Sequence, residues 1–523
     1  MRPTRVLAIA GLVAISLTAA ACGTRRSDDD FVKAGASLQQ QGSDQGTSAG
    51  GADGTTGTTD GASGGSTGVV GPATTGGSTG GGGATGGGAG GGGATGGGST
   101  GGGGATGGHS GGGSSTGGGA NGASDVGVTA TTINLGNIVT KSGSFGPDEF
   151  TTFYYGAAAY FDDLNARGGI NGRKVVFNTC DDSGTDSGDS NCARGFVDKT
   201  KVFAFVANNC LTCPGLNYIS DKAVPAVGGL AIDSRDYALP HFWRYSGDPY
   251  PQNGKIGWKG KLYQGLHQYQ YFKDKFGIKK AGVVWYDNAQ ASKNQGEAIM
   301  AALKAVGIEA TGYGVNVALP QYDSDVIDMK QKGITAVWDA IDIAGNQNLC
   351  KSIDNNGLVL KAKVSTIAVW SQAVGKQFSA PCRNYIYSVE EPGTLTYDQT
   401  SNPEIAKFRA AMKRYFPSRE DRLYQWTVDG WGSAMWFADA AASCGANLTR
   451  GCLEKFLNSP KEYTARGIWW PRSNKKVNFD TSKTLYRCIS IAHWDDALGS
   501  FKNVAPYQST CYTTPYITAP APV

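Results

Sequence analysis

Histidine is scarce in this chain, with only 4 among 523 residues. His241, His267 and His493 show no metal-ligand spacing, and His109 lies in a glycine-rich stretch. Zinc sites and histidine-dependent acid–base catalysis both need such residues in recognisable patterns. We therefore expect no metal, no cofactor and no enzymatic activity.

Long runs of charge of one sign are also missing. The formal net charge is only +4, and no basic block with interleaved aromatic residues occurs, so nucleic acid is not an expected partner. A GxSxG pattern at 64–68 lies in a glycine-rich repeat with no strand before it, so it is not a nucleophile elbow. Adjacent acids such as Asp181 and Asp182 point apart on a strand and rarely make an acid–base pair.

The first 22 residues have the character of an export signal. Arg2 and Arg5 precede an apolar core at 6–17, which is too short to span a bilayer. Small residues then lead into Cys22, as in the bacterial lipobox, where the cysteine is lipidated. Cys22 is also the odd one among eleven cysteines, which favours lipidation over an ordinary secretory signal.

Residues 23–125 form a linker of Gly, Ser, Thr and Ala. Such a composition has no apolar surface to offset the entropy of ordering, so we expect it to be disordered. A glycine-rich coil of ~100 residues has a root-mean-square reach of about 50–60 Å. It would hold a folded part away from an anchor in the outer face of the bacterial cell membrane.

The folded part begins with a strand, a helix and a second strand. Alternating β-branched residues at Thr132–Val139 predict a strand, and apolar residues at helical spacing from Tyr154 to Leu164 predict a helix. Gly168 and Gly169 end that helix before a strand at 174–178. This is a βαβ unit, which predicts a parallel sheet in an α/β fold.

The string NARGGINGR within this unit resembles the opening of the Leu/Ile/Val type of periplasmic binding protein (type I). The resemblance extends from Val126 to the C-terminus and implies two lobes, each a mostly parallel sheet flanked by helices, joined by three crossings. About 400 residues also exceed a usual single core. Buried strands are predicted at 202–206, 281–285, 336–338 and 364–369, and helices at 297–305, 404–415 and 426–442.

The resemblance implies crossings near Gly247, Val389 and Asp480. Lobe 1 would comprise 126–246 and 390–480, lobe 2 would comprise 247–389 and 481–512, and 513–523 would form a tail. A hinge of this kind lets a few loop residues absorb the rotation when lobes close.

Ten cysteines remain after Cys22, and in an exported chain they are expected to form disulfides. Nearness in sequence favours the pairs Cys350–Cys382, Cys444–Cys452 and Cys488–Cys511. The resemblance implies a bridge between the two loops that carry the remaining four, but three connectivities stay open. A redox role for the CxxC is the alternative for two of them, although no thioredoxin-like context surrounds it. The four are Cys180, Cys192, Cys210 and Cys213.

A ligand of such a protein is expected at the carboxyl ends of the strands, in the crevice between lobes. Three loops of lobe 1 qualify because hydroxyls and backbone N–H groups at helix N-termini suit a carboxylate. In amino-acid-binding members, hydroxyls in the second and third loops hold the ligand's carboxylate. Here the second loop offers a hydroxyl and the third offers only backbone groups. The expected contacts are Ser144, Phe145, Leu211, Thr212, Gly229 and Ala231.

Lobe 2 is expected to supply an acid and an aromatic ring, which the family uses to receive an ammonium group. Asp339 and Asp342 follow one strand and Trp370 ends the next. Charge and cation–π attraction would then favour a cationic group. The alternative for Asp339 is an N-cap on the helix that begins at Ile343.

The resemblance therefore predicts a monomeric, lipid-anchored solute-binding protein that delivers a small polar ligand, amino-acid-like or related, to an ABC permease. A sensor that reports ligand occupancy to a membrane receptor remains an alternative with the same fold. A structural surface protein that has lost its ligand, or a tethered cell-wall hydrolase, are alternatives of a different class.

Overall fold

Three β-sheets organise the part of the chain that the computed structural model describes. The described residues are 121–143, 148–232, 234–245, 247, 250–366, 369, 371–390, 402–469, 476–506 and 509–519. The predicted export signal, lipidation of Cys22 and the linker fall almost entirely outside these residues. None of the helices within them combines the length and the apolar character needed to cross a bilayer.

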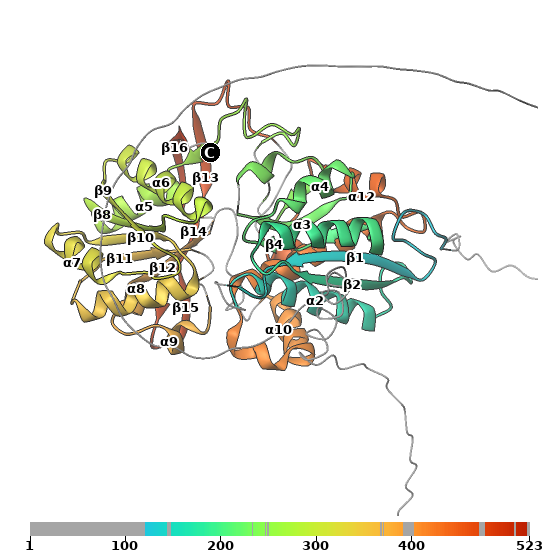
Figure 1. Cartoon of the computed structure of the whole chain (residues 1–523), viewed down its shortest axis with the longest axis horizontal. Coiled ribbons are helices and arrows are strands. Elements are labelled where there is room, and N and C mark those ends of the chain that lie inside the picture. Colours follow the sequence, from blue (N-terminus) through green and yellow to red (C-terminus); the bar gives the residue numbers. More distant parts are fainter. Residues whose placement is uncertain are drawn as a thin grey trace, which may run out of the picture. The chain divides into compact units, whose positions relative to one another are not determined.

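The first sheet is parallel and has six strands in the order β2-β1-β3-β5-β4, with β6 beside β5. Its strands β1, β2 and β4 are labelled in Figure 1. The edge strand β2 pairs with β1 in register from Thr132 opposite Lys174 to Val139 opposite Asp181, which confirms the predicted βαβ unit. The strand predicted at 202–206 begins two residues later. The strands are β1 (Thr132–Val139), β2 (Lys174–Asp181), β3 (Ala204–Val206), β4 (Asn209–Cys210), β5 (Ala226–Ala231) and β6 (Phe242–Arg244).

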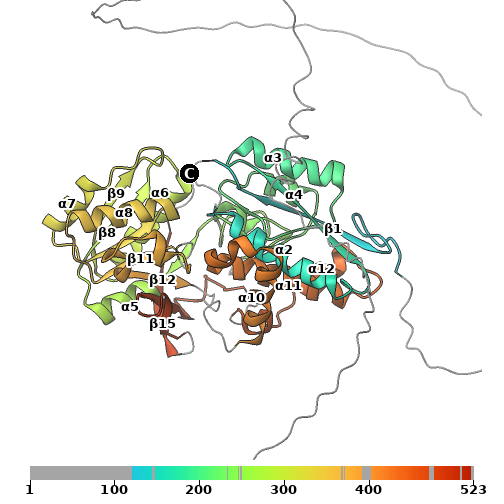
Figure 2. The same cartoon turned by 90° about the horizontal axis from the view of Figure 1, so that it is seen from below.

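Helices cover both faces of this sheet, with α3 and α4 on one face and α2 and α11 on the other (Figure 2). The second group includes segments more than 200 residues later in the chain, because α10 and α11 pack on α2. The elements are α2 (Thr151–Ala166), α3 (Asp186–Arg194), η1 (Gly195–Thr200), α4 (Gly215–Asp221), η2 (Ser234–Ala238), α10 (Pro403–Tyr415), η5 (Pro417–Arg422), α11 (Gln425–Ser443), α12 (Arg450–Leu457) and η6 (Ala465–Gly467).

Two glycines let α2 and α11 approach each other closely. A Cβ on Gly156 would lie 1.8 Å from the carbonyl oxygen of Thr427, and a Cβ on Gly430 would lie 2.0 Å from that of Phe153. Around this crossing the tryptophan and phenylalanine side chains of α11 are buried. The helix predicted at 426–442 is thus a core helix, as expected from its aromatic content.

The second sheet has seven strands in the order β15-β14-β12-β11-β10-β8-β9. Strands β8 to β12 are parallel, and the last two strands of the sheet, β14 and β15, are antiparallel. The strands predicted at 281–285 and 336–338 are confirmed, but the one predicted at 364–369 already ends at Ser365. The strands are β8 (Lys280–Tyr286), β9 (Glu309–Val315), β10 (Ala336–Ala340), β11 (Ala362–Ser365), β12 (Ile386–Glu390), β14 (Ser490–Asp495) and β15 (Ser500–Ala505).

The helices of this half include one that is longer than predicted. The apolar spacing indicated a helix at 297–305, whereas α6 begins at Gln290, because its first two turns are polar and carry no apolar period. The elements are α5 (His267–Phe276), α6 (Gln290–Ala305), α7 (Asp323–Gln331), α8 (Ile343–Asn355), α9 (Val374–Gln377) and η4 (Cys382–Tyr385).

A small third sheet brings together segments that follow the predicted crossings near Gly247 and Asp480 with the last described strand. It contains β7 (Tyr263–Gly265), β13 (Thr484–Cys488) and β16 (Cys511–Thr518), paired antiparallel. Phe479 lies at the centre of an aromatic cluster beside it, with its ring stacked 4.4 Å from that of Tyr263. The lobe boundaries near 247, 389 and 480 remain a prediction.

Candidate functional site

The loop after β1 is anchored by a carboxylate from the neighbouring strand. Asp181 accepts hydrogen bonds from the backbone N–H groups of Lys141, at 2.9 Å, and Ser142, and from the Ser142 hydroxyl at 2.8 Å. Burial opposes these bonds, yet they lower the pKa of Asp181 overall. The expected ligand contacts Ser144 and Phe145, which follow, lie outside the described residues.

The second and third loops of the first sheet present little free polar surface. Thr212 is exposed, whereas Leu211 packs beside Phe150 and Tyr154. Gly229 and Ala231 lie within β5, where the intervening Leu230 N–H donates to the carbonyl of Asn208 at 2.9 Å. Backbone groups that were expected to hold a ligand's carboxylate are therefore partly used in strand pairing.

Five disulfides use all ten cysteines among the described residues. The predicted pairs Cys350–Cys382, Cys444–Cys452 and Cys488–Cys511 are confirmed. The bridge between the two loops, which the family resemblance implied, is absent. Each loop instead closes on itself, through Cys180–Cys192 and Cys210–Cys213.

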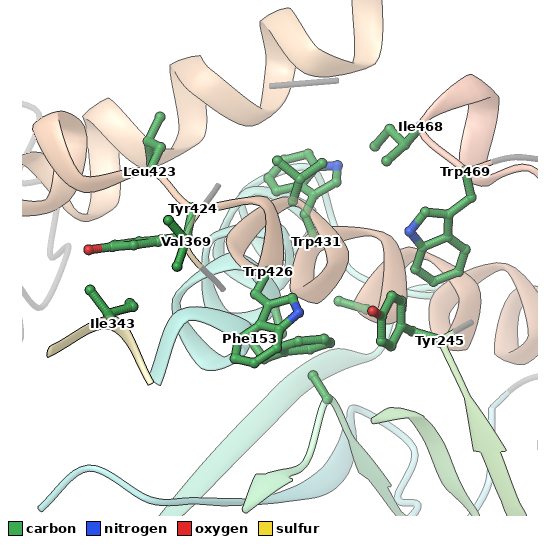
Figure 3. Packing of buried hydrophobic residues seen from close by; sticks show 14 of the residues in the cluster. Phe153, Tyr245, Ile343, Val369, Leu423, Tyr424, Trp426, Trp431, Ile468 and Trp469 are labelled. Atoms are coloured by element: carbon green, nitrogen blue, oxygen red, sulfur yellow. The ribbon is translucent and has the colours of Figure 1, made fainter. Parts of the chain in front are cut away.

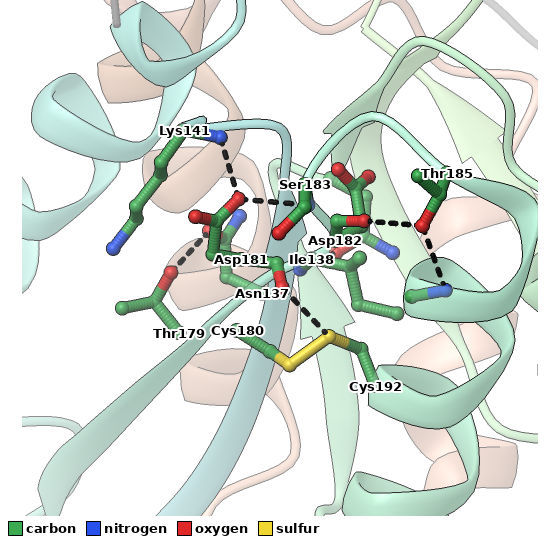
Figure 4. Close-up of a disulfide and its surroundings, with 12 residues drawn as sticks. Asn137, Ile138, Lys141, Thr179, Cys180, Asp181, Asp182, Ser183, Thr185 and Cys192 are labelled. Carbon is green, nitrogen blue, oxygen red and sulfur yellow. Dashed lines mark hydrogen bonds between the residues drawn. A yellow bond between two sulfur atoms is a disulfide. The ribbon is translucent and has the colours of Figure 1, made fainter. Parts of the chain in front are cut away.

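The first of these local bridges ties the end of β2 to α3, as Figure 4 shows beside Asp181, Asp182 and Thr185. Thr185 caps α3 by accepting the Gly188 N–H at 3.1 Å. The cap therefore holds the start of α3, and the disulfide holds its last turn.

One group of described residues has the chemistry of metal ligands: Asp182, Asp189 and Cys210, whose candidate atoms lie within 4.8 Å of one another. The Cys210 sulfur is bonded to Cys213, and Asp189 accepts the Gly215 N–H at 2.5 Å. Burial raises the pKa of Asp189 to about 7, and it also raises that of Asp182. Burial favours the protonated form of both acids and the Cys210 sulfur is already in a disulfide, so we assign no metal to this group.

The predicted contact Asp339 lies near the end of β10 and is 3 % exposed. Its Oδ2 atom is 2.9 Å from Lys363 Nζ, and its Oδ1 atom accepts from Asn346 Nδ2 at 3.0 Å. Lys363 also donates to Ser365 Oγ at 2.6 Å. Burial lowers the pKa of Lys363, and the charge of Asp339 opposes that effect. The carboxylate therefore already has a cationic partner within the protein.

Asp342 is the N-cap of α8, the role considered for Asp339. Its Oδ1 atom accepts from the Gly345 N–H at 2.9 Å and from the Tyr286 hydroxyl at 2.5 Å. Burial, followed by the charge of Asp342, raises the pKa of Tyr286. The third predicted contact of this half, Trp370, lies outside the described residues.

A residue that sequence reasoning missed connects elements of the two large sheets. Glu149 lies just before α2, and its Oε2 atom accepts the backbone N–H of Ile343, the first residue of α8, at 3.0 Å. Burial, followed by the charges of Asp342 and Asp339, raises the pKa of Glu149 to about 8. No sequence signal marks this acid, because its partner is a backbone group 194 residues away.

Apolar side chains surround this contact. Ile343 and Val369, which follow strands of the second sheet, belong to one buried cluster with Leu423, Tyr424 and Trp426 (Figure 3). Ser371 forms a β-bridge with Tyr424 beside them. Apolar side chains from both halves therefore pack together beside the Glu149 contact.

A cavity of about 480 Å³ lies at the edge of this region. Gln372 lines it after β11, while Arg409, Pro417, Glu420 and Leu423 line it from α10 and the segment that follows. Arg409 Nε is buried and has no hydrogen-bond partner among the described residues. The volume falls within the range of small-molecule pockets, and the lining offers both a cation and an anion.

Comparison with known proteins identifies the chain's relatives. A family model described as periplasmic binding protein matches residues 132–498. No curated protein sequence matches the chain.

Several solved structures share the fold. A fatty acid ABC transporter substrate-binding protein from Thermomonospora curvata has a TM-score of 0.56 and 16% identity, covering 75% of this chain and 94% of its own. A branched-chain amino acid transporter substrate binding protein from Streptococcus pneumoniae, in complex with isoleucine, has a TM-score of 0.53 and 16% identity. The match covers 72% of this chain and 100% of that protein. A solute binding protein from R. palustris in complex with benzoate has a TM-score of 0.55 and 12% identity. The match covers 75% of this chain and 98% of that protein.

Proposed function

The chain belongs to the periplasmic binding protein family, and on that premise we propose that it is an extracytoplasmic protein that captures a small ligand for an ABC importer. The observation that carries the proposal is the family match over residues 132–498, which includes the whole first sheet and every strand of the second sheet except β15. The family consists of non-catalytic solute-binding proteins.

The predicted lobes give this proposal its mechanism. A ligand that touches both halves stabilises the closed arrangement by its differential affinity for that arrangement. The predicted lipid at Cys22 and the linker at 23–125 would keep the protein near its permease. Asp339 and Asp342 would then act indirectly, by holding β11 and α8 in place.

We place the ligand in the cavity beside Arg409. The bound molecules of two similar structures, isoleucine and benzoate, each combine a carboxylate with an apolar body. Arg409 would receive such a carboxylate, because a guanidinium donates to it with fixed geometry. Leu423 would face the apolar part, and Gln372 and Glu420 could accept a further donor group.

The test is thermal denaturation of the purified protein with a panel of small carboxylates, amines, amides and sugars. A ligand at a hundred times its dissociation constant adds about 2.7 kcal/mol of stability, which raises the melting temperature visibly. We expect a shift with an apolar carboxylate that Arg409→Gln abolishes and Arg414→Gln, on the exposed side of the same helix, retains. No shift with any compound would contradict the proposed function, whereas a shift unaffected by Arg409→Gln would contradict only the placement.

A further inference from the structure

Glu149 links the two halves of the fold through a single hydrogen bond. It precedes α2, which packs on the first sheet, while its acceptor atom Oε2 meets the N–H of Ile343 at the start of α8. The side chain is buried, with the residue 6 % exposed. An inference from this contact rests on the proposed function, because it concerns how the proposed lobes close.

Charged groups face Glu149 from each neighbouring element, and most are acidic. Asp148 precedes it, Asp342 caps α8 and Asp339 lies on β10. Asp148 is neutralised by Arg419 and Arg422, with 3.3 Å between Arg422 Nη1 and Asp148 Oδ2.

None of the other ionisable groups that the structure describes near Glu149 neutralises it. Lys363 is bonded to Asp339 and Asn346, and the Tyr286 hydroxyl donates to Asp342. Tyr424 adds a phenol whose pKa is raised chiefly by burial, then by the charge of Asp148, with Glu149 contributing less. An ionised Glu149 would therefore be a buried anion with two nearby aspartates.

The surroundings make such an anion unfavourable in the closed arrangement. The apolar cluster around Ile343 and Val369 excludes water, and one backbone N–H does not replace a hydration shell. When the halves separate, the carboxyl would return to water and ionise at its ordinary pKa. In the structure, where Glu149 contacts Ile343, burial and the aspartates raise the pKa of Glu149 to about 8.

We propose that Glu149 is a proton-dependent latch, which holds α8 against the segment before α2 when its carboxyl is protonated and releases it when the carboxyl ionises. Closure then takes up one proton from solvent, because the open form carries a carboxylate and the closed form a carboxylic acid. Release returns that proton. Closure, and with it ligand capture, is therefore favoured at mildly acidic pH and weakens as the pH rises towards 8.

The experiment measures amide hydrogen exchange at Ile343 between pH 5.5 and 8.5, corrected for the intrinsic pH dependence of exchange. In the wild type the protection factor should fall about tenfold per pH unit up to about pH 8 and then level off, since one proton is linked to opening between the ordinary and the raised pKa. Glu149→Gln keeps an acceptor for Ile343 but cannot ionise, so its protection should not vary with pH. Asp148→Asn removes a neighbouring carboxylate but leaves the latch, so it should retain the slope.

Two outcomes would overturn the latch: a protection factor at Ile343 that does not change with pH, or the same slope in Glu149→Gln. If that variant fails to fold, titration of the Glu149 carboxyl in the wild type by carbon-13 NMR decides, and a pKa below about 5 would overturn the proposal. A pH slope without any ligand response would sustain the latch while contradicting the proposed transport function. Ligand binding without a pH dependence of protection at Ile343 would support the proposed function and contradict the latch.

Discussion

Lys363 and Asp339 form a fully buried ion pair, with 2.9 Å between Nζ and Oδ2 and no exposed side-chain surface on either residue. Their strands β11 and β10 are adjacent in the second sheet. Asn346 and Ser365 complete their hydrogen bonding. The pair therefore joins two central strands to the start of α8.

Breaking this pair should be costly. Lys363→Met leaves Asp339 as an uncompensated buried charge, and we expect a loss of about 3–5 kcal/mol in the free energy of unfolding, measured with denaturant. Adding Asp339→Asn should recover part of that loss, because the second charge disappears. Lys332→Ala, which removes an exposed ion pair with Asp328, should cost less than about 1 kcal/mol. Equal losses of unfolding free energy in Lys363→Met and Lys332→Ala would contradict the larger cost expected for the buried pair.

The pair also shows what the sequence could and could not predict. The βαβ unit, the core helix at Gln425–Ser443 and three disulfides follow from local periodicity and nearness in the chain. Asp339 was identified as a polar residue at a strand end, but its partner Lys363 lies in a short strand where a lysine predicts exposure. Only the pairing of β10 with β11 brings them together.

The same limit applies to Glu149 and to the cavity beside Arg409. Both depend on how elements far apart in the chain meet, and neither carries a local motif. The family resemblance implied a disulfide between the two loops, and that pairing is wrong. The structure has the local disulfides Cys180–Cys192 and Cys210–Cys213 instead.

The helix crossing at Gly156 should not tolerate a side chain. Gly156→Ala would place a methyl group 1.8 Å from the Thr427 carbonyl oxygen and force α2 away from α11. We expect a loss of at least about 3 kcal/mol in unfolding free energy, at the upper end for overpacking. Gly451→Ala, in α12 with open space around it, should stabilise by up to about 1 kcal/mol. A neutral Gly156→Ala would mean that the helices are not in this close contact.

The disulfides should differ in their contribution to stability. Cys350–Cys382 spans 32 residues and Cys210–Cys213 only 3. In the chain-entropy model the longer loop is worth about 3–4 kcal/mol and the shorter one about 2 kcal/mol. Replacing each pair by alanine and measuring unfolding in denaturant tests the order. A larger loss for Cys210–Cys213 would show that this bridge holds native structure rather than restricting the unfolded chain.

Asp189 should make the stability fall as the pH rises. Its pKa is about 7 in the folded protein, raised chiefly by burial, whereas an exposed aspartate ionises near 4. The stabilising contribution is therefore complete below about pH 4 and is lost by the time the pH passes 7. Between these limits the slope from this residue is about 1.4 kcal/mol per pH unit.

The measurement is the free energy of unfolding across that pH range for the wild type and two variants. Asp189→Asn keeps an oxygen for the Gly215 N–H and removes the titration of this carboxyl. The fall of the unfolding free energy with pH should therefore become shallower by the slope of one linked proton, about 1.4 kcal/mol per pH unit. Asp186→Asn changes an exposed acid in the same helix and should leave the fall as it is in the wild type. An unchanged slope in Asp189→Asn would mean that this carboxyl is ionised at neutral pH, and a cation between Asp182 and Asp189 would then become the better explanation of their burial.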